Sequence, residues 1–355
     1  MNTVFMYEVS GRCNQSCSFC YNSWKGDGAP TKEQLDTRQA LSLLDKVMDE
    51  TGGCDITLSG GEPLMREDLF LLIDRIKKRG MKVILVSNGT LLTKETVGRC
   101  IAHGVDTFQL TLMSHKPRLH NRLAGIDGFE KVIDAVIEIR NQKGKVYTFF
   151  PALSDNIHTL KGAVELNVLL GVSDMAVGRF TPGGSGLSGW ERLMPSPDAL
   201  TTALDEADET AGRYAINLSI STPILPCLVD PRKYKRVRFG FCGVGNQERA
   251  LFGIDPMGNL KACSHSPRIL GNLLEEPLHR LIEHPFIHEM ISTIPEFCKG
   301  CADLAICRGG CRSSAKVCYG SFREADPFLK LWKERARKPE TPSFGLEGAS
   351  RPSAC

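Results

Sequence analysis

The first half of the chain alternates short runs rich in β-branched and aromatic residues with longer amphipathic segments, about six times in succession. In the second amphipathic segment, Leu69, Leu72, Ile73 and Ile76 have the i, i+3, i+4, i+7 spacing of one helix face. Repeated strand–helix units predict a parallel sheet covered by helices, either an open doubly wound sheet or a complete or partial barrel. The expected strands are residues 4–9, 55–60, 82–88, 107–113, 145–153 and 175–180, and the expected helices are residues 31–50, 66–80, 93–104, 128–144 and 158–171.

Polar and glycine-rich motifs follow the expected strands, at the strand ends where α/β folds bind ligands. A loop with three cysteines, "GRCNQSCSFCYN" (residues 11–22, the cysteine loop), follows the first strand. The sequences "SGGEP" (59–63), "SNGT" (87–90) and "MSH" (113–115) follow the second, third and fourth strands. Gly60 and Gly61 would let the backbone approach a ligand without an intervening Cβ. We expect these motifs to meet on one rim of the sheet.

The composition is that of a water-soluble globular protein. The 355 residues carry 44 basic and 41 acidic side chains, a net charge of +3, so no charge excess favours nucleic acid or a membrane surface as a partner. No apolar run of about eighteen residues and no secretory signal occurs, so we expect no membrane span and a cytoplasmic location. In a reducing compartment, fourteen cysteines indicate metal or redox chemistry more than disulfides.

Cys13, Cys17 and Cys20 form the pattern C-x3-C-x2-C. A cubane iron–sulfur cluster takes one thiolate per iron, so three cysteines would leave one iron open to another ligand. Zinc is the alternative, but a structural zinc site uses four ligands, and no fourth ligand adjoins this loop in the sequence.

Together, "CNQSCSFCY", "SGGEP" and "SNGT" resemble the motifs of radical S-adenosylmethionine (radical SAM) enzymes over about residues 1–220. The resemblance implies a partial (β/α)6 TIM barrel in which Cys13, Cys17 and Cys20 hold a [4Fe–4S] cluster. The methionine amine and carboxylate of SAM would chelate the open iron. Reductive cleavage would then give methionine and a 5′-deoxyadenosyl radical that takes a hydrogen atom from a substrate.

The same resemblance suggests which residues contact SAM. Phe19 would lie against the adenine, and Gly60, Gly61 and Glu62 would meet the methionine amino group. Ser114 would contact the ribose, with a strand-end cap as its alternative role. Arg179 would reach the SAM carboxylate, with a loop-bracing role as its alternative. In "LHNRLAG", Asn121 replaces the acid usual in the family, so we expect a structural role for His120 and Arg122.

A second cysteine group lies between residues 227 and 318. Its spacing, C-x15-G-x4-C followed by C-x2-C-x5-C-x3-C and a final cysteine, resembles the SPASM domain that binds two auxiliary [4Fe–4S] clusters. By the family pattern, one cluster would take Cys242, Cys263 and Cys311, and the other would take Cys298, Cys301, Cys307 and Cys318. Cys227 is expected to complete the first set; alternatively it is a buried apolar residue that leaves an iron open. Two zinc sites are the alternative that does not depend on the family.

The expected organisation is a barrel over residues 1–220, a SPASM domain over 221–320 and a helical or flexible tail over 321–355. Cys54 and Cys100 are interpreted as packing residues, and Cys355 ends a flexible tail. Structural or solvent-facing positions are expected for His265, His279, His284 and His288. Asp155, Glu191 and Asp255 are candidate bases by position, with solvated loop carboxylates as the alternative interpretation.

The resemblance favours a maturase that oxidises or crosslinks a peptide or protein side chain. The alternatives are an enzyme of small-molecule cofactor synthesis, such as the heme-precursor type, and a non-catalytic metal-cluster protein. Since only twelve residues precede Cys13, we expect a peptide substrate to need a separate recognition protein or to dock directly at the barrel mouth. Ferredoxin or flavodoxin is the expected reductant.

Overall fold

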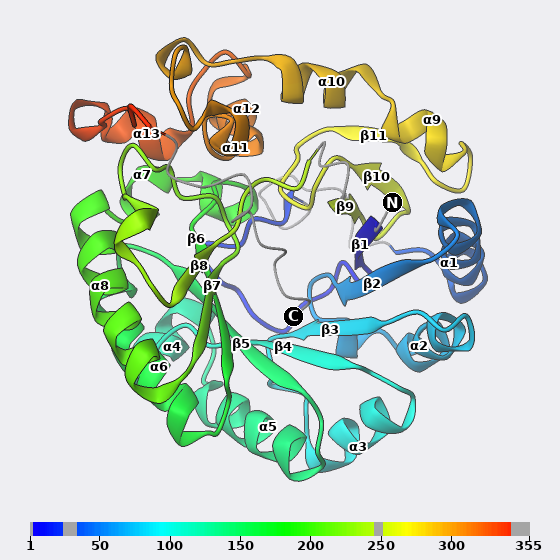
Figure 1. Ribbon diagram of the computed structural model, residues 1–355. Coiled ribbons are helices and arrows are strands. Elements are labelled where there is room, and N and C mark those ends of the chain that lie inside the picture. The colour runs from blue at the N-terminus through cyan, green and yellow to red at the C-terminus, as the bar shows by residue number, and fades with distance from the viewer. Residues whose placement is uncertain (1–2, 24–33, 245–250, 342–355) are drawn as a thin grey trace.

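The computed structural model describes residues 3–23, 34–244 and 251–341 (Figure 1). One eleven-stranded sheet runs through these residues in the order β11-β10-β9-β1-β2-β3-β4-β5-β6-β7-β8. All neighbours from β9 through β1 to β8 are parallel, and β10 and β11 are antiparallel additions at one edge. The strands are β1 (Thr3–Glu8), β2 (Cys54–Ser59), β3 (Val83–Ser87), β4 (Thr107–Thr111), β5 (Val146–Ala152), β6 (Asp174–Arg179), β7 (Asn217–Ile220), β8 (Val237–Phe239), β9 (Leu251–Ile254), β10 (Asn259–Lys261) and β11 (Ile269–Asn272).

Helices cover the outer face of the curved sheet. Figure 1 shows α1 to α6 and α8 around its outside, whereas α9 to α13 gather along one side. The helices are α1 (Thr37–Thr51), α2 (Leu69–Lys78), α3 (Lys94–Ala102), α4 (Pro117–Ala124), α5 (Phe129–Asn141), α6 (Leu160–Leu169), α7 (Trp190–Leu193), α8 (Pro197–Tyr214), α9 (Leu278–Ile282), α10 (Pro285–Ser292), α11 (Leu304–Cys307), α12 (Arg312–Tyr319) and α13 (Pro327–Leu331).

The six expected strands are present as β1 to β6, and the partial-barrel architecture is confirmed. The short strands β7 and β8 extend the parallel run beyond the strands that the sequence predicts. The sheet therefore continues across the boundary expected at residue 220.

Helix α1 starts later than residue 31. It is capped by Asp36, whose carboxylate accepts from the Gln39 backbone N–H while the Gln39 side chain accepts from the Asp36 N–H. These reciprocal bonds form a capping box, which satisfies two backbone donors at the helix start. Thr31, at the start of the expected segment, lies outside the described residues.

Two apolar cores support the sheet, and both contain residues from the C-terminal part of the chain. In the first core, Phe5 of β1 stacks on Phe252 of β9 with ring centroids 5.9 Å apart. The second core combines residues of β5 to β7 and α8 with Phe328 and Leu329 of α13. The cysteine-rich part thus shares its packing with the barrel. Within the described ranges, no helix is both long and apolar enough to cross a membrane.

Candidate functional site

The cysteine loop leaves β1 and is held against the end of α4. The Ser16 N–H donates to the Ala124 carbonyl (3.2 Å), and the Cys17 thiol donates to Gln15 Oε1 (3.3 Å). The Gln15 N–H lies 3.4 Å from the Cys13 sulfur. All three thiols of the loop are half-buried. Local backbone turns therefore keep the thiols near the surface of the rim.

The glycine motif after β2 packs directly onto this loop. The Gly61 N–H donates to the Ser10 carbonyl (2.7 Å), and Gly60 has a φ of 140°. A Cβ on Gly61 would lie 2.0 Å from the Arg12 carbonyl oxygen and 2.9 Å from the Cys13 Cβ. Only glycine allows this approach, because any side chain would displace the backbone that carries Cys13.

Glu62 connects the loops after β2 and β3. Its buried carboxylate accepts from the Ser87 hydroxyl and the Asn88 N–H, both at 2.8 Å. The Asn88 side chain donates to Asn14 Oδ1 (2.8 Å), and the Asn14 amide donates to Thr90 Oγ1 (2.8 Å). The cysteine loop, "SGGEP" and "SNGT" are therefore joined in one hydrogen-bonded layer at the strand ends, as the sequence predicts.

Phe19 and Ser114 lie in the same region. Phe19 is half-buried and packs against the second core. Ser114 is fully buried, and its hydroxyl accepts from the Lys116 N–H (3.0 Å). This bond agrees with the strand-end cap that the sequence analysis gives as the alternative role of Ser114. Its contact with a ribose stays a prediction.

Arg179 does not have the expected position for contact with a SAM carboxylate. Its guanidinium pairs with Asp326 at 2.7 Å, and both side chains are 0% exposed. It also donates to the Pro223 carbonyl (3.1 Å). The Asp326 carboxylate accepts in addition from the Cys311 N–H (2.6 Å). Arg179 therefore joins the end of β6 to the cysteine-rich part, which agrees with the bracing alternative.

His120 and Asn121 have structural roles. The Asn121 side-chain oxygen accepts from the N–H groups of Gly128 and Phe129, at 3.1 and 2.9 Å, at the start of α5. His120 is fully buried, and its Nδ1 lies 3.3 Å from the Met113 N–H. Burial lowers the pKa of His120 to about 4, so the ring is neutral at pH 7.

The three candidate bases are carboxylates of loops or, for Glu191, of the short helix α7. Asp155 pairs with Arg122 at 3.2 Å, and both side chains are more than half exposed. Asp255 accepts from the Asn259 N–H (3.0 Å) inside a turn. Glu191 is exposed. Their environments favour the solvated-carboxylate interpretation over a catalytic one.

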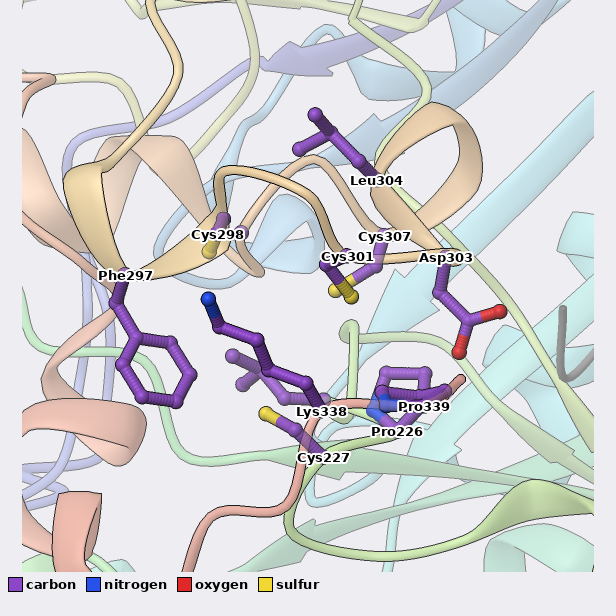
Figure 2. A pocket seen from close by; sticks show the side chains of 12 residues that line it. Pro226, Cys227, Phe297, Cys298, Cys301, Asp303, Leu304, Cys307, Lys338 and Pro339 are labelled. Atoms are coloured by element: carbon purple, nitrogen blue, oxygen red, sulfur yellow. The ribbon is translucent and has the colours of Figure 1, made fainter. Parts of the chain in front are cut away.

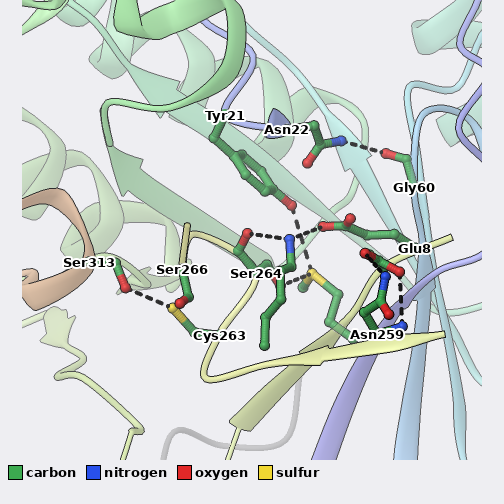
Figure 3. A network of polar contacts seen from close by, with 12 residues as sticks. Glu8, Tyr21, Asn22, Gly60, Asn259, Cys263, Ser264, Ser266 and Ser313 are labelled. Carbon is green, nitrogen blue, oxygen red and sulfur yellow. Dashed lines mark hydrogen bonds and ion pairs between the residues drawn. The ribbon is translucent and has the colours of Figure 1, made fainter. Parts of the chain in front are cut away.

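Three cysteines of the C-terminal part come together as the first trio: Cys242, Cys263 and Cys311. Burial and then the neighbouring Cys263 and Cys311 thiols raise the pKa of Cys242 to about 12. Burial and then Asp326 and Cys263 raise the pKa of Cys311 to about 11. The Cys263 sulfur also lies 3.2 Å from the Ser313 hydroxyl (Figure 3). The three thiols are therefore electrostatic neighbours, and their binding of one cluster stays a prediction.

The second trio is Cys298, Cys301 and Cys307. With Cys227 and Lys338 these thiols line one pocket, and Figure 2 shows the four sulfur atoms directed toward a shared space. Burial is the largest cause of the raised pKa of Cys227, and the next causes are the neighbouring thiols of Cys307, Cys298 and Cys301. The sequence analysis places Cys227 with the first trio, so its position here differs from the prediction.

Cys318 lies in helix α12, near the acidic residues Asp326 and Glu191. After burial, the groups that raise its pKa to about 12 are Asp326, Glu191 and Cys311. Its role as a ligand of the second expected set stays a prediction. Among the described residues, no three His, Cys, Asp or Glu side chains converge as a single metal ion would require. A cubane differs from a single ion in this respect, because each of its thiolates binds a different iron.

The interior of the barrel mouth holds a buried polar network. Glu8 and Lys261 are 0% and 4% exposed, with Lys261 Nζ 3.7 Å from Glu8 Oε1. The Tyr21 hydroxyl donates to the Met6 sulfur (3.9 Å), and the Tyr21 and His265 rings are 4.3 Å apart. Figure 3 shows Glu8 well separated from Cys263, whereas Tyr21 has both Cys20 and Cys263 as electrostatic neighbours. The network therefore lies between the cysteine loop and the first trio.

Sequence reasoning missed Glu8, Lys261, Arg312 and Asp326. For Glu8 a signal was present, because a carboxylate ends the otherwise apolar run "VFMYEV", and alternate residues of a strand face the barrel interior. No local pattern marks Arg312 and Asp326, whose partners lie on other elements.

The remaining cysteines and histidines have packing or surface positions where they are described. Cys100 is buried in the first core, and burial raises its pKa to about 12. His284 accepts from the Phe286 N–H (3.0 Å) at the start of α10, and His279 and His288 are exposed. The Cys54 side chain and Cys355 lie outside the described part of the chain.

Comparison with known proteins identifies the family. The profile of the Radical SAM superfamily matches residues 7–166. The PqqA peptide cyclase of Xanthomonas oryzae pv. oryzae (strain MAFF 311018) is 26% identical over 366 residues, covering 98% of this chain and 95% of the relative. The AdoMet-dependent heme synthase of Methanosarcina barkeri (strain Fusaro / DSM 804) is 24% identical over 350 residues, covering 92% and 95%.

The fold has close counterparts among solved structures. Native anSMEcpe with bound AdoMet has a TM-score of 0.72 at 18% identity, and the match covers 94% of this chain and 96% of that one. This likeness concerns the fold, which includes the cysteine-rich C-terminal part. With the matched profile and the motif layer at the strand ends, the chain is a radical SAM enzyme that uses S-adenosylmethionine and a [4Fe–4S] cluster, and it belongs to the radical SAM superfamily.

Proposed function

We propose that this enzyme oxidises or crosslinks a side chain of a peptide or protein substrate by hydrogen-atom abstraction. Cys13, Cys17 and Cys20 hold the SAM-binding [4Fe–4S] cluster, and the C-terminal cysteines hold two auxiliary [4Fe–4S] clusters. The chain is accordingly organised as a barrel (1–220), an auxiliary-cluster domain (221–320) and a tail (321–355). The observation that carries the proposal is the close packing of the Gly60–Gly61 backbone on the loop that bears Cys13.

The residues present fit this cofactor set. Three half-buried thiols on one loop match three irons of a cubane and leave the fourth free for SAM. The glycine edge beside them keeps a side-chain-free surface next to Cys13, and Glu62 fixes that edge to the next loop. When bound, the reduced cluster and SAM supply one electron and a 5′-deoxyadenosyl group, and the resulting radical removes a hydrogen atom from the substrate.

The chain contributes position and exclusion of water. The layer of three loops holds the cysteine loop rigidly, and the interior network of Glu8, Lys261 and Tyr21 fills the barrel beneath it. Rigid placement of the reacting groups raises the rate of hydrogen abstraction because the groups are already positioned. A site without water limits side reactions of the radical.

The first trio lies close to the cysteine loop, which supports a role in electron transfer. Burial is the main reason why the pKa of Tyr21 lies well above 10, and the nearby groups Glu8, Cys20 and Cys263 raise this pKa further. Tyr21 thus lies near both Cys20 and the first trio. Cys242, Cys263 and Cys311 would hold an auxiliary cluster here, and such a cluster would supply a one-electron acceptor beside the barrel mouth.

A peptide substrate is favoured by the relative with the higher identity, a PqqA peptide cyclase that aligns over 98% of this chain. The peptide docks at the barrel mouth directly or through a separate recognition protein. Ferredoxin or flavodoxin delivers the electron that cleaves SAM, because no flavin or nicotinamide motif is present in the sequence.

Synthesis of a small-molecule cofactor is the second candidate. It is favoured by the alignment with an AdoMet-dependent heme synthase, which at 24% identity over 92% of this chain is nearly as similar. The two candidates share the SAM chemistry and differ only in the substrate.

The first experiment measures 5′-deoxyadenosine after reduction of anaerobically reconstituted protein with SAM. Cys17→Ala should abolish its formation, whereas Cys100→Ala, a change in the first core, should retain it. Unchanged 5′-deoxyadenosine from Cys17→Ala would contradict the assignment of the triad.

The second experiment assigns the substrate class. A deuterated synthetic peptide, encoded by a short gene next to that of the enzyme, should transfer deuterium into 5′-deoxyadenosine, and the unlabelled peptide should lose two hydrogens per modified site in mass spectrometry. Deuterium transfer from a labelled porphyrin precursor, with none from the peptide, would favour the second candidate.

A further inference from the structure

A buried arginine lies close to both cysteine trios. Arg312 is the first residue of α12 and directly follows Cys311 of the first trio. We propose that Arg312 supplies positive charge to the auxiliary clusters and that its Nε–H donates to a sulfur atom of one of them. This inference rests on the proposed function for the presence of these clusters. It makes Arg312 a positioning residue that sets a reduction potential.

Three backbone carbonyls hold the Arg312 guanidinium. The residue is 2% exposed. Its Nη1 donates to the Glu324 carbonyl (3.1 Å), and its Nη2 donates to the carbonyls of Thr293 (3.2 Å) and Phe322. The guanidinium carbon also lies 5.7 Å from the centre of the Phe322 ring. Because the acceptors come from two separate segments, the guanidinium has one fixed position.

The charge and one donor of Arg312 are not accounted for by the described part of the chain. Within residues 3–23, 34–244 and 251–341, Arg312 forms no ion pair, and its buried Nε has no acceptor. Arg179, the other large buried arginine of this region, pairs instead with Asp326 at 2.7 Å. A buried cation needs nearby negative charge, and a buried N–H needs an acceptor.

Thiols of both trios surround Arg312 electrostatically. Burial lowers the pKa of the Arg312 guanidinium, and the groups that raise it are, in order, Cys298, Asp326, Cys311 and Cys242. The carboxylate among them is already paired with another arginine. Thiolate-ligated clusters on the trios are therefore the remaining source of negative charge for this cation.

The hydrogen bonds of Arg312 agree with this position. Thr293, whose carbonyl accepts from the guanidinium, lies five residues before Cys298 of the second trio. Ser313 is the next residue after Arg312, and its hydroxyl lies 3.2 Å from the sulfur of Cys263 in the first trio. One residue thus connects the backbone segments that carry thiols of both trios.

The chemistry of a cubane gives the expected effect its direction. The reduction potential of an iron–sulfur cluster depends on its net charge, on hydrogen bonds to its sulfur atoms and on its exposure to solvent. Reduction adds one negative charge, so a fixed cation and an N–H donor stabilise the reduced form. Burial strengthens this effect because solvent screens the charge less. Arg312 should therefore hold the potential at a higher value.

The test uses full-length protein that is reconstituted anaerobically with all its clusters. Redox titrations followed by electron paramagnetic resonance (EPR) compare the wild type with Arg312→Gln, which removes the charge, and Arg312→Lys, which keeps it. Arg323→Gln is the matched control, because Arg323 is exposed and stands between the two residues whose carbonyls accept from Arg312 on this segment. Iron and sulfide are counted for every variant.

We expect Arg312→Gln to shift the potential of at least one auxiliary cluster to a more negative value, with no change for the SAM-binding cluster. Arg312→Lys should give a smaller shift, and Arg323→Gln should give none because solvent screens its charge. Unchanged potentials at full iron content, or equal shifts for Arg312→Gln and Arg312→Lys, would overturn the inference. A role limited to bracing the three carbonyls would not produce this charge dependence.

A second measurement needs no substitution at Arg312 and so does not depend on the folding of those variants. The wild type is produced with arginine that carries ¹⁵N in the guanidinium group. Pulsed EPR of the reduced auxiliary clusters should then detect coupling to ¹⁵N. Arg308, whose Nη1 donates to the Val244 carbonyl (2.9 Å), is a neighbouring arginine, so the coupling should persist in Arg308→Lys. Absence of the coupling, or its loss in Arg308→Lys, would overturn the inference.

The iron content of the wild type separates this inference from the proposed function. Three cubanes correspond to about twelve iron atoms per chain. About four iron atoms per chain would contradict the auxiliary clusters of the proposed function and this inference with them. Full iron content with unchanged potentials would contradict the role of Arg312 alone.

Discussion

Arg179→Met should destabilise the protein strongly, because it leaves a buried carboxylate without its counter-charge. Arg179 and Asp326 are 2.7 Å apart and both side chains are 0% exposed, so no solvent can compensate the remaining charge. Removing one partner of such a pair costs about 3–5 kcal/mol. The loss of the Arg179 bond to the Pro223 carbonyl falls within that range.

Scanning calorimetry under anaerobic conditions measures this effect against a matched control. Arg213→Met removes the same side chain from a pair with Glu209 whose side chains are 64% and 73% exposed. An exposed i, i+4 pair contributes about 0.5 kcal/mol or less. With an unfolding entropy of about 2.1 cal/mol/K per residue over 355 residues, Arg179→Met should lower Tm by roughly 5 °C and Arg213→Met by less than 1 °C.

Equal Tm shifts for the two variants, at equal iron loading and scan rate, would refute this reasoning. The double variant Arg179→Met/Asp326→Asn adds a further check. It removes both charges while the asparagine oxygen can still accept from the Cys311 N–H, so part of the loss should be recovered. A double variant that is less stable than Arg179→Met would mean that the charge imbalance is not the cause.

Three further predictions concern the rim. Gly61→Ala should prevent normal loading of the N-terminal cluster because its Cβ would lie 2.0 Å from the Arg12 oxygen, whereas Gly212→Ala in α8, with its nearest atom at 3.6 Å, should load normally in iron assays. Glu62→Gln places an amide donor against the Ser87 hydroxyl or the Asn88 N–H. It should lower the free energy of unfolding by about 1–3 kcal/mol, measured by thermal unfolding, and it should weaken SAM binding in calorimetric titration. Since burial lowers the pKa of His120 from 6.5 to about 4, the unfolded chain binds a proton in this window that the folded chain does not. The free energy of unfolding should therefore fall by up to roughly 3 kcal/mol as the pH drops from 6.5 to 4. Urea titrations at several pH values should show that the free energy of unfolding of His120→Gln changes less with pH.

The sequence predicts the six strands β1 to β6 because each is a β-branched run followed by an amphipathic helix. The strands β7 and β8 have only four and three residues and escape this reasoning. Their pairing comes from the neighbouring strand, not from their own composition. The predicted start of α1 at residue 31 is also wrong, since the capping box of Asp36 and Gln39 starts the helix at Thr37.

The rim of the candidate site is local in sequence and could be predicted. The cysteine loop and the "SGGEP" and "SNGT" motifs each follow a strand, and parallel strands bring these ends together. Arg179 could not be assigned, because its partner Asp326 is 147 residues away. The place of Cys227 beside Cys298, Cys301 and Cys307 depends likewise on packing between distant segments, and the sequence analysis expected it with the first trio.

Asp326 explains how the cysteine-rich part holds a fixed position relative to the barrel. Its carboxylate accepts from the Cys311 N–H of the first trio, pairs with Arg179 at the end of β6, and caps α13 through the Phe328 N–H (2.8 Å). Within the sheet, β9 pairs with β1 directly before the cysteine loop. The first trio is therefore fixed to the barrel from two sides by buried contacts. Because electron transfer depends on separation, this double attachment would hold a cluster bound by the first trio at a constant distance from the barrel mouth.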